Sequence, residues 1–152
     1  MKISPYNFLF ALSKIRQSQH AFIENALAAA GVKDISPSYG DVLFVLDRRG
    51  PLTLLEIARL TMKDKSTVSS VIQKLEEHGY VTKKKGKGDS RFKTIELTAK
   101  ARRLKPLILE ISGEMNERLY RGMSESEKAR LFKLIEKVFD NSAADAEPKD
   151  KT

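Results

Sequence analysis

The amino-acid sequence predicts a mainly α-helical fold with one small β-hairpin. Apolar residues recur at the helical period of about 3.6 residues along most of the 152-residue chain. In the centre, two short helical patterns are separated by only three residues, Met62 to Asp64. After Gly79 the pattern changes to a near-alternation of β-branched and aromatic residues, which is typical of strands. These observations place a helix pair and a hairpin at the centre of the chain, with further helices on both sides.

The first central helix carries a clear start signal. Thr53 is followed three residues later by Glu56, and this spacing predicts a capping box, in which each side chain accepts a hydrogen bond from a backbone N–H. Leu54 and Ile57 give the helix an apolar side. Asp64 is a favourable N-cap for the second central helix, because its carboxylate can accept hydrogen bonds from the amides of the first turn.

The second central helix has one apolar and one polar side. The spacing i, i+3, i+4 and i+7 predicts a buried stripe made of Val68, Val71, Ile72 and Leu75. At about 100° per residue, the opposite side carries Ser66, Ser69, Ser70, Gln73 and Lys74. Gly79 is expected to end this helix, because glycine readily adopts a left-handed backbone at a helix C-terminus.

The hairpin that follows is strongly basic. Its strands are predicted in Tyr80–Thr82 and Phe92–Thr98, and the glycines and the Asp-Ser pair between them favour a flexible tip. Residues 83–93 hold six basic side chains and one acid, a local charge of +5. Two short helices with a tight turn, followed by a basic hairpin, predict a winged helix-turn-helix core in residues 36–98.

The distribution of charge points to a polyanion as the partner. The chain has a formal net charge of +8, from 28 basic and 20 acidic residues. Between Lys63 and Lys105 we count 13 basic and 5 acidic residues, so this stretch holds a net +8 and the other segments sum to zero. A single basic run is usually a solvated face. The coincidence of this run with a helix-turn-helix pattern favours nucleic acid.

The central part of the chain contains three consecutive motifs, DKSTVSSVIQKLEEHGYVTKK, then GDSR, then IELTAKA. With these motifs the chain resembles the MarR family of bacterial transcription regulators, and the resemblance extends roughly from Ser36 to Phe139. Asp89 and Arg91 match the D-x-R pair of the family's wing, and Leu97-Thr98 matches the L-T of the L-T-x-x-G stretch that opens the next helix. Ala101 stands where the family usually has glycine, a departure that affects the corner between strand and helix.

The polar side of the second central helix and the wing are expected to contact double-stranded DNA. The major-groove set is Lys65, Ser66, Thr67, Ser69, Ser70, Gln73 and Lys74. Lys84, Lys85 and Lys87 are expected to contact phosphates. The resemblance implies that Arg91 reaches into the minor groove while Asp89 orients its guanidinium.

The flanking helices are predicted from periodicity and end signals. A first helix is expected over residues 5–29 and a second from about Tyr39 to the Gly50–Pro51 stop. A third follows over residues 99–120, where Pro106 should cause a kink or mark a late start. Ser124 and Glu127 form a second capping-box pattern before the last helix. We expect one domain, with residues 141–152 as a flexible tail.

The terminal helices, residues 5–31 and 99–140, carry more apolar surface than one buried stripe needs. They could pack on their own chain or pair with a second copy about a two-fold axis, and the family resemblance implies the second arrangement, a homodimer. The expected interface residues are Phe8, Leu12, Ile15, Leu131, Phe132, Ile135, Val138 and Phe139. The resemblance also implies a small aromatic or phenolic effector, bound between the dimer helices and the DNA-binding lobe.

Other function classes are disfavoured. Without cysteine and with only His20 and His78, neither of which has a ligand-spaced neighbour, no metal site or cofactor is expected. No catalytic constellation is recognisable, so an enzyme is not expected. No apolar run approaches the ~20 residues of a membrane span, and a cytoplasmic location is expected. The alternative to a DNA-binding repressor is a winged-helix module that places its basic face on an acidic protein. Polar side chains on the exposed side of the second central helix, which we call the reading face, favour DNA as the partner. A hot spot for protein binding would instead be rich in aromatic residues and arginine.

Overall fold

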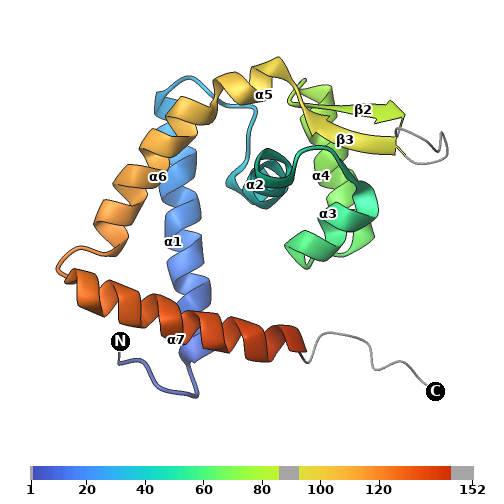
Figure 1. Cartoon of the computed structure of the whole chain (residues 1–152). Helices are drawn as coiled ribbons and strands as arrows, with labels where there is room; N and C mark the ends of the chain where they lie inside the picture. The colour runs from blue at the N-terminus through green and yellow to red at the C-terminus, as the bar shows by residue number, and fades with distance from the viewer. Residues whose placement is uncertain (1, 86–92, 145–152) are drawn as a thin grey trace, which may run out of the picture. The chain divides into compact units, whose positions relative to one another are not determined.

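The computed structural model describes residues 2–85 and 93–144, which belong to two compact units, residues 1–115 and 116–152 (Figure 1). The first unit contains α1 (Phe8–Ala29), the 3-10 helix η1 (Pro37–Tyr39), α2 (Gly40–Arg49), β1 (Leu52–Thr53), α3 (Leu54–Thr61), α4 (Lys65–Glu77), β2 (Val81–Lys85), β3 (Lys93–Leu97), α5 (Ala99–Arg103) and most of α6 (Lys105–Leu119). The second unit contains the end of α6 and α7 (Glu125–Ala144). The predicted mainly helical fold with a small β wing is confirmed.

The start of α3 is stabilised by the capping box that the sequence predicts. The backbone N–H of Thr53 donates to the Glu56 carboxylate at 2.7 Å, and the Glu56 N–H donates to the Thr53 hydroxyl at 3.3 Å. The hydrogen bond from the Thr53 backbone holds the pKa of the Glu56 carboxyl below its ordinary value. Because both partners lie within one turn, this feature could be read from local spacing alone.

The turn between α3 and α4 is closed by a left-handed residue. Met62 has φ of 52°, and the Lys63 N–H reaches back to the Ala58 carbonyl at 3.1 Å. This is the hydrogen bond of a Schellman-type helix end, here made without glycine. The turn allows α4 to leave α3 at once, so α3 and α4 are in contact, and both contact α2.

The sheet has three strands, in the order β1-β3-β2, and all pairs are antiparallel. The hairpin of β2 and β3 was predicted, but its first strand was predicted to end at Thr82 and continues to Lys85, because residues 83–85 pair with residues 93–95 of β3. The register places Val81 opposite Leu97 and Lys85 opposite Lys93. The third strand was not predicted. Leu52 and Thr53 pair with Ile95 and Thr94, and a strand of two residues is too short to show a period in the sequence.

A single hydrophobic cluster holds the first unit together. It contains the predicted stripe of α4, residues from α1, α2, α3, the sheet and α6, and two residues from connecting segments, Ile35 and Tyr80. The full set is Leu27, Ile35, Val42, Leu46, Leu52, Ile57, Val68, Val71, Ile72, Leu75, Tyr80, Val81, Ile95 and Ile111. Because the whole stripe of α4 lies in this cluster, the opposite side of α4 faces outward.

Three helix boundaries differ from the prediction or sharpen it. The first helix begins at Phe8 rather than near Pro5, because the Asn7 side chain accepts from the Ser4 N–H at 2.7 Å in a turn before the helix. The helix predicted over residues 99–120 is divided at Leu104 into α5 and α6. Pro106 is the second residue of α6, where its missing N–H breaks no helical hydrogen bond, so the predicted late start is confirmed.

The second unit contains the second predicted capping box. The Ser124 N–H donates to the Glu127 carboxylate at 2.8 Å, and the Glu127 N–H donates to the Ser124 hydroxyl at 3.3 Å. The rings of Tyr120 and Phe132 meet edge to face, with centroids 5.4 Å apart. The helix α7 continues to Ala144, so the tail predicted to begin at residue 141 is helical over its first four residues. None of the described helices combines the length and apolarity that a membrane crossing needs.

Candidate nucleic-acid interface

The outer side of α4 is a continuous polar surface. Its buried side chains are Val68, Val71, Ile72 and Leu75. The structure places all seven side chains of the predicted major-groove set on the exposed side: Lys65, Ser66, Thr67, Ser69, Ser70, Gln73 and Lys74. They present hydroxyl, amide and ammonium groups, which are the groups that contact base edges and phosphates in DNA grooves.

The first turn of α4 is arranged around Asp64. The Asp64 carboxylate accepts hydrogen bonds from the Thr67 N–H at 2.8 Å, the Thr67 hydroxyl at 2.6 Å and the Ser66 hydroxyl at 2.5 Å. These hydrogen bonds, that of Ser66 above all, hold the pKa of the Asp64 carboxyl far below its ordinary value. Since both hydroxyl protons are directed to Asp64, the oxygens of Ser66 and Thr67 are left to act as acceptors toward a ligand.

The amide of Gln73 is oriented by the next turn of α4. Its Nε2 donates to the Glu77 carboxylate at 2.9 Å, a contact between positions i and i+4. The second Nε2 proton and the Oε1 atom remain for a ligand. One donor beside one acceptor is the pattern that pairs with N7 and N6 of adenine.

A surface hollow of about 380 Å³ lies along α4. It is lined by Tyr39, Ser66, Thr67, Ser70, Val71 and Lys74. Five of these residues come from α4, and four of those five belong to the predicted major-groove set. Tyr39 was not predicted at this site, because the sequence indicated only that the second helix starts near it. Its approach to α4 depends on tertiary packing, for which the sequence carries no local signal.

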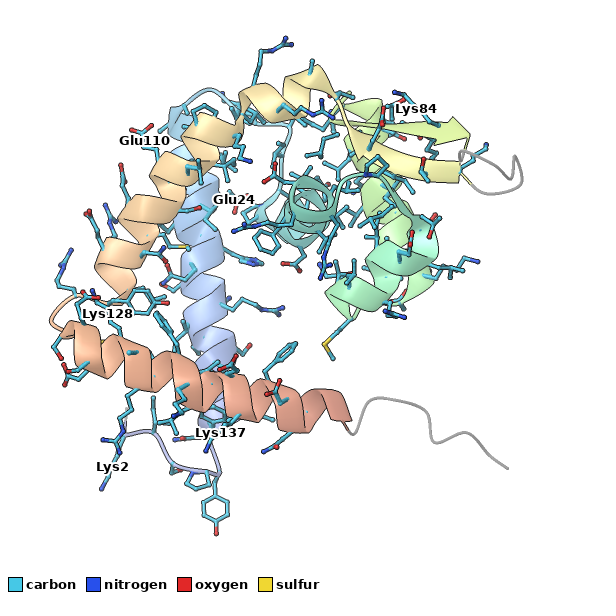
Figure 2. All side chains as sticks on the ribbon, viewed as in Figure 1. Lys2, Glu24, Lys84, Glu110, Lys128 and Lys137 are labelled. Atoms are coloured by element: carbon cyan, nitrogen blue, oxygen red, sulfur yellow. The ribbon has the colours of Figure 1, made fainter. Side chains whose placement is uncertain are left out.

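The described part of the wing contains ion pairs that the sequence pattern does not predict. Lys84, labelled in Figure 2, pairs with Glu96 on the neighbouring strand. Lys83 pairs with Glu76 of α4 at 2.5 Å, and this contact joins the wing to the end of α4. The backbone of Lys85 lies in β2. Lys87, Asp89 and Arg91, together with their predicted roles, lie outside the described residues.

Comparisons with known proteins agree with this arrangement. A family model described as the MarR family matches residues 33–91. The chain is 30% identical over 114 residues to an uncharacterized HTH-type transcriptional regulator, YcgE of Bacillus subtilis strain 168, and the match covers 74% of this chain and 73% of that protein. The chain belongs to the MarR family. It is also 25% identical over 100 residues to the HTH-type transcriptional repressor IacR of Pseudomonas putida. That match covers 66% of this chain and 60% of IacR, which is less than two thirds of the relative's length.

Solved structures show the same fold. A MarR protein from Peptoclostridium difficile has a TM-score of 0.83 at 23% identity, with 95% of this chain and 93% of that chain covered. A structure of Bordetella bronchiseptica BpsR, described as a mechanism for regulation of its DNA binding by 6-hydroxynicotinic acid, has a TM-score of 0.75 at 18% identity, with 91% and 99% covered. These likenesses establish a shared MarR-type fold.

The described residues of this MarR-family chain bring the predicted reading face and the start of the wing into one unit. In residues 2–85 and 93–144, no group of three or more His, Asp and Glu side chains is placed to hold a metal ion. The predicted dimer residues are divided between the two units, three on α1 in the first and five on α7 in the second. Leu12 and Ile15 on α1, and Phe132, Ile135, Val138 and Phe139 on α7, are exposed in the single chain. Phe8 and Leu131 are half-buried.

Proposed function

We propose that this protein is a homodimeric, sequence-specific regulator that binds double-stranded DNA and acts as a ligand-responsive repressor on a pseudo-palindromic operator. The observation that carries the proposal is the polar outer face of α4, opposite a buried stripe, in a chain of the MarR family. The net charge of +8 within residues 63–105 supports it, because phosphate contacts supply much of the affinity of proteins for DNA. The proposed DNA partner favours a cytoplasmic location and a binding rather than a catalytic function.

The alternative, a protein-binding module, is less well supported. The exposed side of α4 carries hydroxyl, amide and ammonium groups, carboxylates in its last turn at Glu76 and Glu77, and no aromatic or arginine side chain. Protein-binding hot spots are enriched in tryptophan, tyrosine and arginine. The chemistry of this face therefore favours base edges and phosphates over an acidic protein surface.

The proposed dimer is supported by apolar side chains that the single chain leaves exposed. On α7 these side chains occupy positions 132, 135, 138 and 139, which share one side of the helix. Soluble monomers rarely expose contiguous apolar patches of this kind. In a two-fold dimer, two reading helices would face DNA about one helical turn, roughly 34–36 Å, apart.

The proposed effector is a small aromatic or phenolic acid. The support is the family, together with the description of BpsR as regulated by 6-hydroxynicotinic acid. Such a ligand would act by binding one dimer geometry better than another, and so would shift the population that can bind DNA. A panel of hydroxylated aromatic acids, titrated against an operator complex, would test this class.

The proposed DNA binding is tested with heparin and random duplex DNA. We expect retention on heparin and a duplex shift whose log affinity falls linearly with log salt, by about 0.9 for each phosphate neutralised. Selection from random duplexes should then recover a pseudo-palindromic sequence. Absence of binding at low salt, or an affinity that salt does not change, would contradict the proposal.

Replacing Gln73 with alanine is expected to change base preference at one or two operator positions. Loss of the amide that Glu77 orients should weaken the free energy of binding by roughly 1–3 kcal/mol for operators with the preferred base, and should have little effect for operators with other bases. The measurement is a binding-site logo for Gln73→Ala beside one for Gln17→Ala, which removes an exposed amide from α1. A uniform loss at all sequences would show instead that Gln73 contacts only phosphate.

Replacing Lys84 with alanine is expected to weaken binding to all duplexes alike. The change removes one proposed phosphate contact and leaves Glu96 without the ammonium that pairs with it, so the salt slope should fall by about one unit. The matched variant Glu96→Gln keeps Lys84 and removes the acid, and it should strengthen binding to all duplexes. Unchanged slopes in both variants would indicate that this part of the wing lies away from DNA.

A further inference from the structure

Three segments that are distant in the chain meet at the C-terminal end of α4. Tyr80, only 2% exposed, donates from its hydroxyl to one carboxylate oxygen of Asp34 at 2.6 Å. The ammonium of Lys100 donates to the other Asp34 oxygen at 2.8 Å and to the His78 carbonyl at 2.9 Å. The same ammonium lies 4.1 Å from the centroid of the Tyr80 ring. Asp34 lies between α1 and η1, Tyr80 follows α4, and Lys100 is the second residue of α5.

The chemistry of this Asp34–Tyr80–Lys100 cluster fixes its charge state. The hydrogen bond from Lys100, followed by that from Tyr80, lowers the pKa of the Asp34 carboxyl. The Asp34 carboxylate raises the pKa of the Lys100 ammonium, and burial raises the pKa of the Tyr80 phenol. At neutral pH the cluster therefore holds a carboxylate, an ammonium and a neutral phenol, joined by charge-assisted hydrogen bonds.

A second set of hydrogen bonds connects the start of α5 to the end of α4. The Thr98 N–H donates to the Tyr80 carbonyl at 3.0 Å, and the Thr98 hydroxyl donates to the Gly79 carbonyl at 2.7 Å. These bonds join only α4 and α5. The contacts of Asp34 add the third segment, the chain that arrives from α1.

The position of the cluster in the chain suggests its role. The reading helix α4 is connected to the proposed dimer helices by two covalent routes, one arriving from α1 through residues 30–36 and one leaving through α5. The cluster links both routes at the end of α4. A change in the angle between these segments would move α4 relative to the helices that form the proposed dimer. A fixed angle between segments requires supporting polar contacts, and the cluster supplies them.

We propose that Asp34, Tyr80 and Lys100 are positioning residues that set the separation of the two reading helices, and hence the half-site spacing that the dimer accepts. This inference rests on the proposed function. It assigns no DNA contact to the cluster. Its expected signature is therefore a change in spacing preference rather than a change in base preference or in affinity for one half-site.

The test uses full-length protein and the half-site recovered by selection with the wild type. Duplexes carry either one half-site or two half-sites whose separation is varied one base pair at a time. Lys100→Met keeps a long side chain and removes the ammonium. Arg103→Met removes one positive charge from the same helix at an exposed position, and it controls for general electrostatic attraction. Lys100→Arg restores a charged donor for Asp34.

The expected result is a flatter spacing profile. In Lys100→Met, the preference for the best spacing over its neighbours should fall about fivefold, while affinity for one half-site matches that of Arg103→Met. Asp34→Asn and Tyr80→Phe should flatten the profile as well, and Lys100→Arg should restore it. Circular dichroism melting of each variant verifies that the compared proteins are folded.

Two results would overturn the inference, and they differ in what they imply for the proposed function. If the wild type discriminates spacing and the three cluster variants keep its profile, the cluster has no positioning role and the proposed function stands. If the wild type selects no sequence, or binds two half-sites without regard to spacing, the proposed dimeric regulator fails and the inference fails with it.

Discussion

A charge placed within the apolar side of α7 is expected to convert the protein to a monomer and to weaken its binding to a two-half-site duplex by about two orders of magnitude. Ile135→Asp is the variant of choice. Phe132 and Phe139, which share its side of the helix, are 50% and 59% exposed in the single chain. If a second copy covers these rings, the new carboxylate would be buried without a partner at the centre of the interface, and association would be lost.

The control for this prediction lies on the opposite side of the same helix. Ser126 is exposed, sits in the first turn of α7 and lies about 180° around the helix axis from Ile135, at 100° per residue. Ser126→Asp adds the same charge at a helix N-terminus, where a negative charge is tolerated. It should leave the mass and the DNA affinity unchanged.

Light scattering at micromolar concentration gives the mass of each protein, and titration of the same samples gives the affinity. A wild-type protein with the mass of a monomer and intact DNA binding would refute the dimer and the spacing mechanism that depends on it. A dimer mass for Ile135→Asp would place the interface elsewhere on the molecule.

Much of the fold could be predicted because its signals are local. Both capping boxes, Thr53–Glu56 and Ser124–Glu127, join residues three apart. Residues with this spacing are neighbours at the start of a helix, so the sequence alone predicts the contact. The buried stripe of α4 followed in the same way from the helical period. The exposed side chains expected on that helix are exposed in the structure for the same reason.

The features that could not be predicted depend on partners far along the chain. The strand β1 exists only because Leu52 and Thr53 pair with residues 94 and 95. The Tyr80–Asp34 hydrogen bond spans 46 positions and the Lys100–Asp34 bond spans 66. The ion pair of Lys84 with Glu96 is a cross-strand contact that periodicity does not reveal, and the phosphate contact of Lys84 stays a prediction. The end of α7 was predicted too early, although the alanines after Asn141 favour continuation of a helix.

Truncation of Leu75 to alanine is expected to lower the free energy of unfolding by about 2–5 kcal/mol. Leu75 is 0% exposed and lies in the hydrophobic cluster that holds α4 to the rest of the first unit. The change removes apolar contacts and leaves a cavity beneath the reading helix, whereas Lys74→Ala, one residue away on the exposed side, should change stability by less than about 0.5 kcal/mol.

The measurement for Leu75→Ala is urea unfolding at one fixed protein concentration, because association contributes to the apparent stability of a dimer. The midpoint should fall while the slope with denaturant is kept. Binding-site logos of Leu75→Ala and Gln73→Ala, recorded under conditions in which both variants are folded, distinguish the role of the buried side of α4 from that of its exposed side. Leu75→Ala should lose stability and keep the logo, and Gln73→Ala should keep stability and change the logo. A loss below about 1 kcal/mol for Leu75→Ala would contradict the packing of α4, since burial of a leucine side chain alone contributes more.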